Sequence, residues 1–225
     1  FAGAGSGKTR VLTYKIVYLI EEIGLPPENV LAVTFTNKAA GEMKERVQSL
    51  AKTNIESALI GTFHSVCARI LRKEIKLLGY TNDFAIYDQS DTRSAIKKVI
   101  NSLSLDIKKF DARSLNTYIS NAKNMMYDPS YMLSISDGFL DEKKAEIFKK
   151  YQEFLKENNA VDFDDLILLT LRLFVEFPKK LNYYQNKFKY ILVDEYQDTN
   201  FIQSQWLKLL AEKNENICCV GDDDQ

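Results

Sequence analysis

The stretch Ala2-Gly3-Ala4-Gly5-Ser6-Gly7-Lys8-Thr9 determines how the rest of this 225-residue sequence is interpreted. Glycines at alternate positions let backbone N–H groups curl around phosphate oxygens, and a following helix offers free N–H groups and a favourable dipole. In such a loop Lys8 reaches the β- and γ-phosphates of a nucleotide, and the Thr9 hydroxyl ligates Mg²⁺. The strict pattern GxxxxGK[ST] begins with glycine, where this sequence has Ala2. A flexible Gly/Ser stretch is the alternative interpretation, and the Lys-Thr pair before a helix disfavours it.

A second candidate site follows the apolar run Tyr190–Val193. The run predicts a buried strand, and α/β sheets bind ligands at the carboxyl ends of their strands. Asp194 would hold Mg²⁺ there, and Glu195 would orient and deprotonate a water molecule that attacks phosphate. A water-activating glutamate favours hydrolysis over transfer to a second substrate. An Asp-Glu pair alone is also compatible with a solvated turn, so the interpretation depends on the phosphate loop.

Short apolar runs alternate with helical stretches over about the first ninety residues, and this texture returns near the end. Short apolar strands between helices are typical of a parallel sheet covered on both faces. We therefore expect an α/β fold, with strands at Val30–Val33, Ala58–Ile60, Phe84–Tyr87, Tyr190–Val193 and Ile217–Val220. Helices are expected over Lys8–Ile23, from Thr36-Asn37 onward, and over Ser65–Leu78 and Leu166–Phe177.

The middle of the chain has helical periodicity with capping residues and few strand-like runs. The expected helix starts are Ser90 or Asp91, Asp111, Asp128-Pro129 and Asp141. The sequence thus predicts a discontinuous core, residues 1–87 and 160–225, interrupted by an α-helical domain over 88–159.

Composition excludes several classes of protein and of site. The hydrophobic fraction of 45% and the charged fraction of 27% are typical of a globular protein. Thirty Lys and Arg against 31 Asp and Glu give a net charge of −1, so no global positive field indicates a nucleic-acid partner. Cys67, Cys218 and Cys219 form no CxxC pair and the chain has one histidine, which disfavours structural zinc and indicates reduced thiols in the cytoplasm. No apolar run reaches the roughly 18–20 residues of a membrane span.

Two segments that follow predicted strands are candidates for single-stranded DNA. Thr34–Ala40 and Gly61–Ser65 each place an aromatic ring beside short polar side chains, which suits base stacking and phosphate contacts. From composition alone, phenylalanines in such segments are more often core residues and a lone histidine more often has a structural role, so composition by itself favours these alternatives over DNA binding. The candidate residues are Phe35, Thr36, Asn37, Thr62, Phe63 and His64.

The chain ends in Gly221-Asp222-Asp223-Asp224-Gln225, again after an apolar run. Its three carboxylates are compatible with a metal cluster or with a solvated loop, and the amide of Gln225 is suited to sensing a γ-phosphate. Because the sequence begins at Phe1 beside the glycine-rich loop and stops here, we expect a fragment of a longer protein.

Six segments together resemble one family. AGAGSGKTR, VTFTNKAAGEMKERV, GTFHSVCARIL, DFDDLI, YILVDEYQDTN and VGDDDQ, in this order, are similar to the superfamily-one DNA helicases of the UvrD/Rep/PcrA type. The resemblance spans nearly the whole chain, and Val193–Asn200 is its most specific part.

The resemblance implies a RecA-like first motor domain of an ATP-dependent 3′-to-5′ helicase, split by a helical insertion that engages duplex DNA near a fork. It implies a catalytic base at Glu195, a link from γ-phosphate to the DNA-binding elements at Gln225, and a DNA track including Phe35, Asn37, Phe63 and His64. It assigns Mg²⁺ to Thr9 and Asp194, and ATP to Ala2, Gly3, Ala4, Gly5, Ser6, Gly7, Lys8, Thr9 and Arg10, with the arginine packing on adenine. Asp162-Phe163-Asp164-Asp165 matches a family motif to which the sequence assigns no physical role.

The family also has an upstream adenine-reading glutamine motif and a second motor domain with catalytic arginines. We therefore expect this fragment, as a monomer, to bind Mg-ATP weakly and neither to hydrolyse it well nor to unwind DNA. The partners implied are single-stranded DNA and single/double-strand junctions, in repair, replication or protein displacement. Two alternatives stay open at this point, the motor half of an AddA/RecB-type helicase–nuclease and a non-catalytic ATP- or DNA-binding module.

Overall fold

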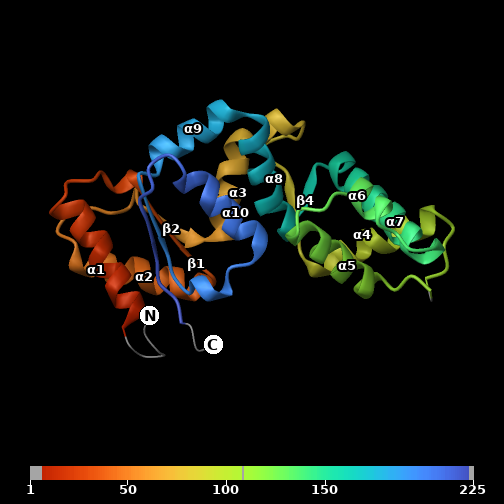
Figure 1. The fold of residues 1–225 in the computed structure, drawn as a ribbon, viewed down its shortest axis with the longest axis horizontal. Coiled ribbons are helices and arrows are strands. Elements are labelled where there is room, and N and C mark those ends of the chain that lie inside the picture. The colour runs from red at the N-terminus through yellow and green to blue at the C-terminus, as the bar shows by residue number, and fades with distance from the viewer. Residues whose placement is uncertain (1–6, 108, 223–225) are drawn as a thin grey trace. The chain divides into compact units, whose positions relative to one another are not determined.

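The computed structural model describes residues 7–107 and 109–222 (Figure 1). It divides into two compact units, the first made of Phe1–Arg69 with Leu173–Gln225 and the second of Ile70–Arg172. The segment 88–159, expected to be an inserted domain, falls within the second unit.

The first unit is built on a four-stranded sheet in the order β2-β1-β5-β6, with each neighbouring pair parallel. Its strands are β1 (Val30–Thr34), β2 (Leu59–Thr62), β5 (Tyr190–Val193) and β6 (Ile217–Cys219). All five residues of β1 are buried, as expected for a central parallel strand covered on both faces. The predicted α/β fold with a parallel sheet is confirmed.

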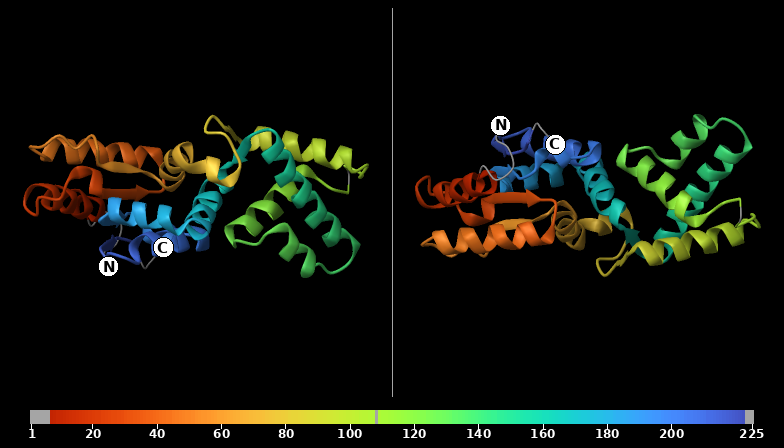
Figure 2. Two further views of the ribbon diagram at one scale, coloured as in Figure 1. Left: turned by 90° about the horizontal axis from the view of Figure 1, so that it is seen from above. Right: turned by 90° about the horizontal axis from the view of Figure 1, so that it is seen from below.

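Helices cover both faces of this sheet. Helices α1 (Lys8–Glu21) and α2 (Asn37–Leu50) pack on the face formed by Val30, Ala32 and Leu192, and Figure 2 shows them side by side. Because side chains alternate along a strand, Leu31 and Val33 point to the other face. There lie α3 (Phe63–Glu74) and α10 (Phe201–Ala211) (Figure 1). The unit is completed by α9 (Pro178–Lys187) and the 3₁₀ helices η1 (Pro27–Asn29) and η3 (Tyr196–Asp198).

The second unit is mainly helical. Its elements are η2 (Ile75–Leu78), α4 (Gln89–Ser102), α5 (Ala112–Asn124), α6 (Pro129–Ser134), α7 (Phe139–Glu157) and α8 (Phe163–Glu176), the last of which crosses into the first unit after Arg172. Apolar side chains from α4, α5 and α7, among them Ile96, Ile119 and Phe148, form its core.

The strand predicted at Phe84–Tyr87 is present as β3 (Ala85–Tyr87), but it does not join the main sheet. It pairs in parallel with β4 (Ala160–Asp162) in a separate two-stranded sheet, with Ala85 opposite Ala160. This pairing ties together the chain on either side of the helices α4–α7, and therefore belongs to the second unit.

Helix starts follow local capping chemistry. The side chains of Thr36, Asp111 and Asp128 accept hydrogen bonds from the first turns of α2, α5 and α6, as predicted. Helix α4 instead begins after Asp88, whose carboxylate accepts from two backbone N–H groups, those of Ser90 at 2.7 Å and Asp91 at 2.9 Å. Helix α7 begins after Gly138, before the predicted Asp141. No helix within residues 7–107 and 109–222 is long and apolar enough to cross a membrane.

Candidate functional site

Some of the predicted site residues lie outside the described part of the chain. These are Ala2, Gly3, Ala4, Gly5, Ser6, the side chain of Lys8, and Gln225.

Gly7 places the start of α1 at the carboxyl edge of the main sheet. Its backbone is left-handed, with φ 85° and ψ 19°, a conformation that glycine adopts without steric penalty. Its carbonyl accepts from the N–H of Val11 at 3.0 Å, which closes the first turn of α1. A glycine has no side chain to cap the helix, so the N–H groups of the first turn are suited to an anion.

Thr9 and Asp194 bring the two predicted motifs together. The Thr9 hydroxyl donates to Oδ2 of Asp194 at 3.1 Å, although the residues are 185 positions apart. Asp194 is 3% exposed, and its N–H donates to the carbonyl of Val33 at 3.0 Å, which fixes it at the end of β5. Hydroxyl and carboxylate oxygens are the ligands that Mg²⁺ prefers, so this pair fits the ion expected beside a nucleotide.

Glu195 sits in a turn that sets the direction of its side chain. Its φ of 51° and ψ of 47° are left-handed, which costs a non-glycine residue on the order of 1 kcal/mol or more. Its N–H donates to Oδ1 of Asp194 at 3.1 Å, and its Oε2 accepts from Nε2 of Gln197 at 2.7 Å. A positive φ also occurs at Ser104, Met126, Asn159 and Glu215. The hydrogen bonds to Asp194 and Gln197 therefore distinguish Glu195, and its backbone conformation does not.

Gln197 is a site residue that the sequence did not single out. Its amide contacts both Glu195 and the backbone of Asp222, at 2.7 and 2.9 Å. The only sequence signal was its place two residues after Glu195 inside the specific stretch Val193–Asn200. The second contact depends on β6 pairing with β5, which a local pattern does not reveal.

The two candidate DNA segments differ in exposure. Thr36 and Asn37 are exposed at the start of α2, and the Thr36 hydroxyl accepts from the N–H of Ala39 at 3.1 Å. Phe35 is half-buried beside them.

Phe63, by contrast, lies in the core, with 1% of its surface exposed. Its ring centroid is 5.6 Å from that of Phe35 and 5.9 Å from that of Trp206 on α10. Thr62 is also buried, and its hydroxyl accepts from the N–H of Ser65 at 3.2 Å, while His64 is half-buried. Phe63 therefore has no face to offer a base in this structure, and the core interpretation describes its position.

Arg10 lies on the exposed side of α1. Its guanidinium is 5.4 Å from the ring centroid of Tyr14, within the range of a cation–π contact. Both side chains are exposed near the start of α1, which is compatible with packing of Arg10 on a nucleotide base.

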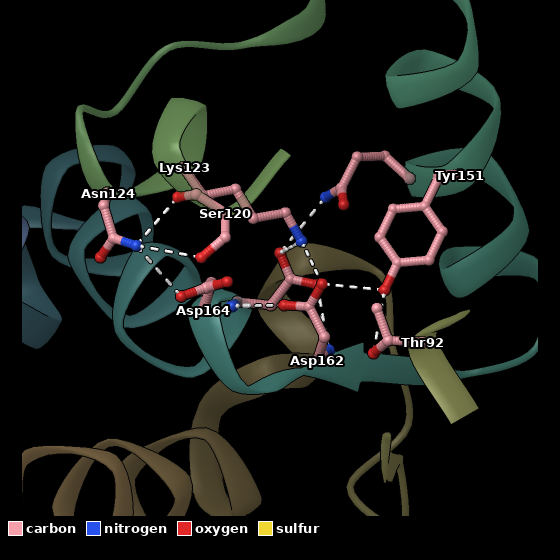
Figure 3. Close-up of polar contacts among 9 residues, drawn as sticks. Thr92, Ser120, Lys123, Asn124, Tyr151, Asp162 and Asp164 are labelled. Atoms are coloured by element: carbon pink, nitrogen blue, oxygen red, sulfur yellow. Dashed lines mark hydrogen bonds and ion pairs between the residues drawn. The ribbon is translucent and has the colours of Figure 1, made fainter. Parts of the chain in front are cut away.

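Two carboxylates of the motif Asp162-Phe163-Asp164-Asp165, those of Asp162 and Asp165, belong to a buried ionic cluster in the second unit, whereas Phe163 is exposed (Figure 3). Nζ of Lys123 lies 2.6 Å from Oδ2 of Asp162 and 2.8 Å from Oδ1 of Asp165, and the Tyr151 hydroxyl donates to Asp162 at 2.9 Å. The side chain of Lys123 is 0% exposed. The cluster joins α5, α7 and the start of α8, so the physical role of this motif is to hold the second unit together.

The charges of this cluster shift one another's pKa values. Burial alone would lower the pKa of Lys123, but the two carboxylates raise it above its ordinary value. Burial, with the neighbouring Asp162, raises the pKa of Asp165 to about 6. Burial acts to raise the pKa of Asp162, but the charge and hydrogen bond of Lys123, together with hydrogen bonds from the Asp165 N–H and the Tyr151 hydroxyl, hold it below its usual value.

Comparison with known proteins places this site in a family. The chain matches the UvrD/REP helicase N-terminal domain over residues 1–225. It is 49% identical over 224 residues to the ATP-dependent DNA helicase PcrA of Bacillus subtilis (strain 168), covering 100% of this chain and 30% of that relative. It is 50% identical over 224 residues to PcrA of Staphylococcus aureus (strain Mu50 / ATCC 700699), covering 100% of this chain and 31% of that relative. The chain thus spans under a third of the length of these relatives, and it belongs to the UvrD/REP helicase N-terminal domain family.

Proposed function

We propose that this chain is the N-terminal motor domain of an ATP-dependent DNA helicase that moves 3′ to 5′ along single-stranded DNA. The observation that carries the proposal is the 3.1 Å contact between Thr9 and Asp194, which joins the phosphate-loop helix to the strand bearing Glu195. The identity of 49–50% over 224 residues to proteins named ATP-dependent DNA helicases supports the class of reaction.

The nucleotide half of the site works through position and charge. The backbone around Gly7 and the first turn of α1 bind phosphate oxygens, and Lys8 reaches the β- and γ-phosphates. Thr9 and Asp194 hold Mg²⁺, which when bound neutralises negative charge on the phosphates. Glu195 orients the attacking water and accepts its proton. Arg10 packs on the adenine, and Gln225 links the γ-phosphate to the DNA-binding elements.

The DNA half lies at the same edge of the sheet. Phe35 offers its partly exposed ring to a base, and Thr36 and Asn37 bind phosphate at the start of α2. Phe63 packs against Phe35 from the core, the buried Thr62 holds the start of α3 through Ser65, and the half-buried His64 completes the surface. The helical insertion contacts single/double-strand junctions. Action on DNA in relatives from bacteria supports a cytoplasmic protein that works in repair or replication.

The chain alone is expected to be a poor catalyst and a monomer. A second motor domain would supply the arginines that stabilise γ-phosphate charge, and one such arginine contributes about 10³–10⁵ in rate. We expect the 225 residues alone to bind Mg-ATP weakly and not to unwind DNA.

Steady-state ATP hydrolysis by the full-length protein tests the proposal, with and without a single-stranded oligonucleotide. Lys8→Ala should abolish turnover under both conditions. Phe35→Ala should raise the oligonucleotide concentration for half-maximal stimulation by roughly 5- to 150-fold, because stacking on one base contributes about 1–3 kcal/mol. Tyr183→Ala on α9, which removes a ring that is 55% exposed, is the matched control and should not change that concentration.

Each contrary outcome is specific. Hydrolysis that is indifferent to DNA contradicts the track at Phe35. A folded full-length protein without hydrolysis contradicts the motor and favours a non-catalytic binding module.

A further inference from the structure

The side-chain amide of Gln197 joins two loops at the carboxyl edge of the main sheet. One is the turn Asp194-Glu195 after β5, and the other is the segment Gly221-Asp222 after β6. Nε2 of Gln197 donates to Oε2 of Glu195 at 2.7 Å, and its Oε1 accepts from the N–H of Asp222 at 2.9 Å. Both ends of the amide are therefore engaged at once.

The chemistry of the partners fixes the orientation of this amide. The backbone N–H of Asp222 can only donate, so the atom that faces it must be the oxygen of Gln197. The nitrogen is then directed at the Glu195 carboxylate, which accepts when it is ionised. A charge-assisted hydrogen bond of this kind is stronger than one between neutral groups, so it restricts the rotamers of Glu195.

The second loop is shaped to receive the amide. A Cβ added to Gly221 would lie 2.7 Å from Oε1 of Gln197 and 3.3 Å from its backbone nitrogen. Backbone hydrogen bonds hold the two loops this close together. The Tyr196 N–H donates to the Val220 carbonyl and the Val220 N–H donates to the Val193 carbonyl, each at 2.9 Å. A side chain at position 221 would displace the amide from Asp222.

We propose that Gln197 is a positioning residue that holds the Glu195 carboxylate in its reactive orientation and couples it to the Gly221-Asp222 segment. The proposal rests on the proposed function of Glu195 as the base. A displacement of the segment would pull on Oε1 of Gln197 and thereby turn the carboxylate attached to Nε2.

Two substitutions in the full-length protein separate the two ends of the amide. Gln197→Met removes both hydrogen bonds while keeping a side chain of nearly the same length. Gln197→Glu keeps an oxygen that accepts from the Asp222 N–H and places a second carboxylate beside Glu195. Both should lower the kcat of DNA-stimulated ATP hydrolysis by about 10–100-fold, with little change in KM for ATP, because a misplaced base loses orientation and not substrate binding. Hydrogen exchange at the Asp222 amide should accelerate in Gln197→Met and stay slow in Gln197→Glu.

Two further variants serve as controls. Gln185→Met removes a buried amide that donates to the Leu209 carbonyl at 2.8 Å, and it should change neither kcat nor Asp222 exchange. Gly221→Ala places a Cβ against the Gln197 amide from the other loop and should displace it from Asp222. This variant should therefore reproduce the kinetic effect of Gln197→Met, although Gln197 and Glu195 are themselves unchanged.

A double-mutant cycle distinguishes this proposal from the function on which it rests. If Gln197 acts through Glu195, then Gln197→Met should lower turnover no further in a Glu195→Gln background. Wild-type kcat in folded Gln197→Met, or an undiminished second loss in the Glu195→Gln background, overturns the positioning role. Wild-type turnover in Glu195→Gln alone overturns the base instead.

Discussion

Strands β4 and β5 each lead into a buried aspartate, and the two aspartates have different partners. Strand β4 ends in Val161-Asp162 and β5 is followed by Asp194 directly after Val193, and each aspartate is almost fully buried, at 5% and 3% exposed. After Asp162 the chain enters α8 at once. After Asp194 it turns through the left-handed Glu195.

The partners of the two aspartates differ in kind. Asp162 is held by the ammonium of Lys123, the hydroxyl of Tyr151 and a reciprocal capping arrangement with Asp165. Asp194 shares a hydrogen bond with the Thr9 hydroxyl, itself an oxygen of the type that binds magnesium. The comparison teaches that an apolar strand followed by acidic residues can lead either to a buried cross-link or to the proposed magnesium site, according to which side chains approach from elsewhere in the chain.

Removing the cation of the cross-link should have the largest effect. Lys123→Ala leaves two buried carboxylates without their counter-ion, and breaking a buried pair costs about 3–5 kcal/mol of unfolding free energy. Urea unfolding of the chain at neutral pH measures the loss. Lys150→Ala removes an equally short contact, 2.7 Å to Glu153, from an exposed pair and should leave the unfolding midpoint unchanged. Equal midpoints for the two variants would mean that the buried cluster is not a cross-link.

The next largest effect is expected in the pH dependence of stability, which tests the buried cluster through Asp165. The folded-state pKa of Asp165 is raised to about 6 from an ordinary value of 3.8, so the folded state binds this proton more tightly than the unfolded state. Its contribution to stability is complete below the unfolded pKa and is lost as pH rises through about 6. Urea unfolding should therefore show wild type losing stability relative to Asp165→Asn between about pH 4 and pH 6.

Asp111 provides a control for which the expected change of stability with pH has the opposite sign. Hydrogen bonds from Ser114 lower the pKa of this exposed cap below 3.8, so its contribution is present above that pH and is lost on acidification. Wild type should lose stability relative to Asp111→Asn only below about pH 4. A gap between wild type and Asp165→Asn that does not vary with pH would contradict the protonation of Asp165 in the folded cluster.

The smallest effect on stability is expected at Asp194, the proposed magnesium ligand. Thr9→Val removes the hydrogen bond to Asp194 and should lower the unfolding free energy by about 1 kcal/mol at most. In the full-length protein the same variant should lower ATP turnover by more than about 10-fold, because the proposed magnesium ligand is lost. Thr9→Ser keeps the hydroxyl and should retain turnover. A Thr9→Val protein with normal turnover would separate Thr9 from the metal.

Sequence alone predicted what depends on neighbouring residues and on sheet geometry. The strands β1, β5 and β6 and the caps at Asp111 and Asp128 follow from local apolar runs and short polar side chains. The meeting of Thr9 with Asp194 was also predictable, because both follow from motifs at the carboxyl edge of one sheet.

Features that depend on distant packing were not predictable in the same way. The burial of Phe63 requires Trp206 on α10, and the cross-link at Asp162 requires a lysine 39 residues earlier. The apolar sequence of β3 predicts a strand of the main sheet, yet β3 pairs with β4, from which four helices separate it in the sequence. The contact between Gln197 and Asp222 requires two loops to meet, which no single pattern encodes.

The parallel pairing of β3 with β4 also has a consequence for how such a chain can change over generations. Parallel neighbours need only a crossover of about a dozen residues, the length of a single helix. Here the connection contains four helices, α4 to α7, while the strands that begin and end it stay in register at Ala85 and Ala160. The strands fix where the connection begins and ends, while Lys123 on α5 and Tyr151 on α7 tie its helices to Asp162 at the end of β4, so a replacement for these helices must keep both contacts. Natural variation and protein engineering can therefore change the length of this connection at its loops more readily than at α5 or α7, which carry the partners of Asp162.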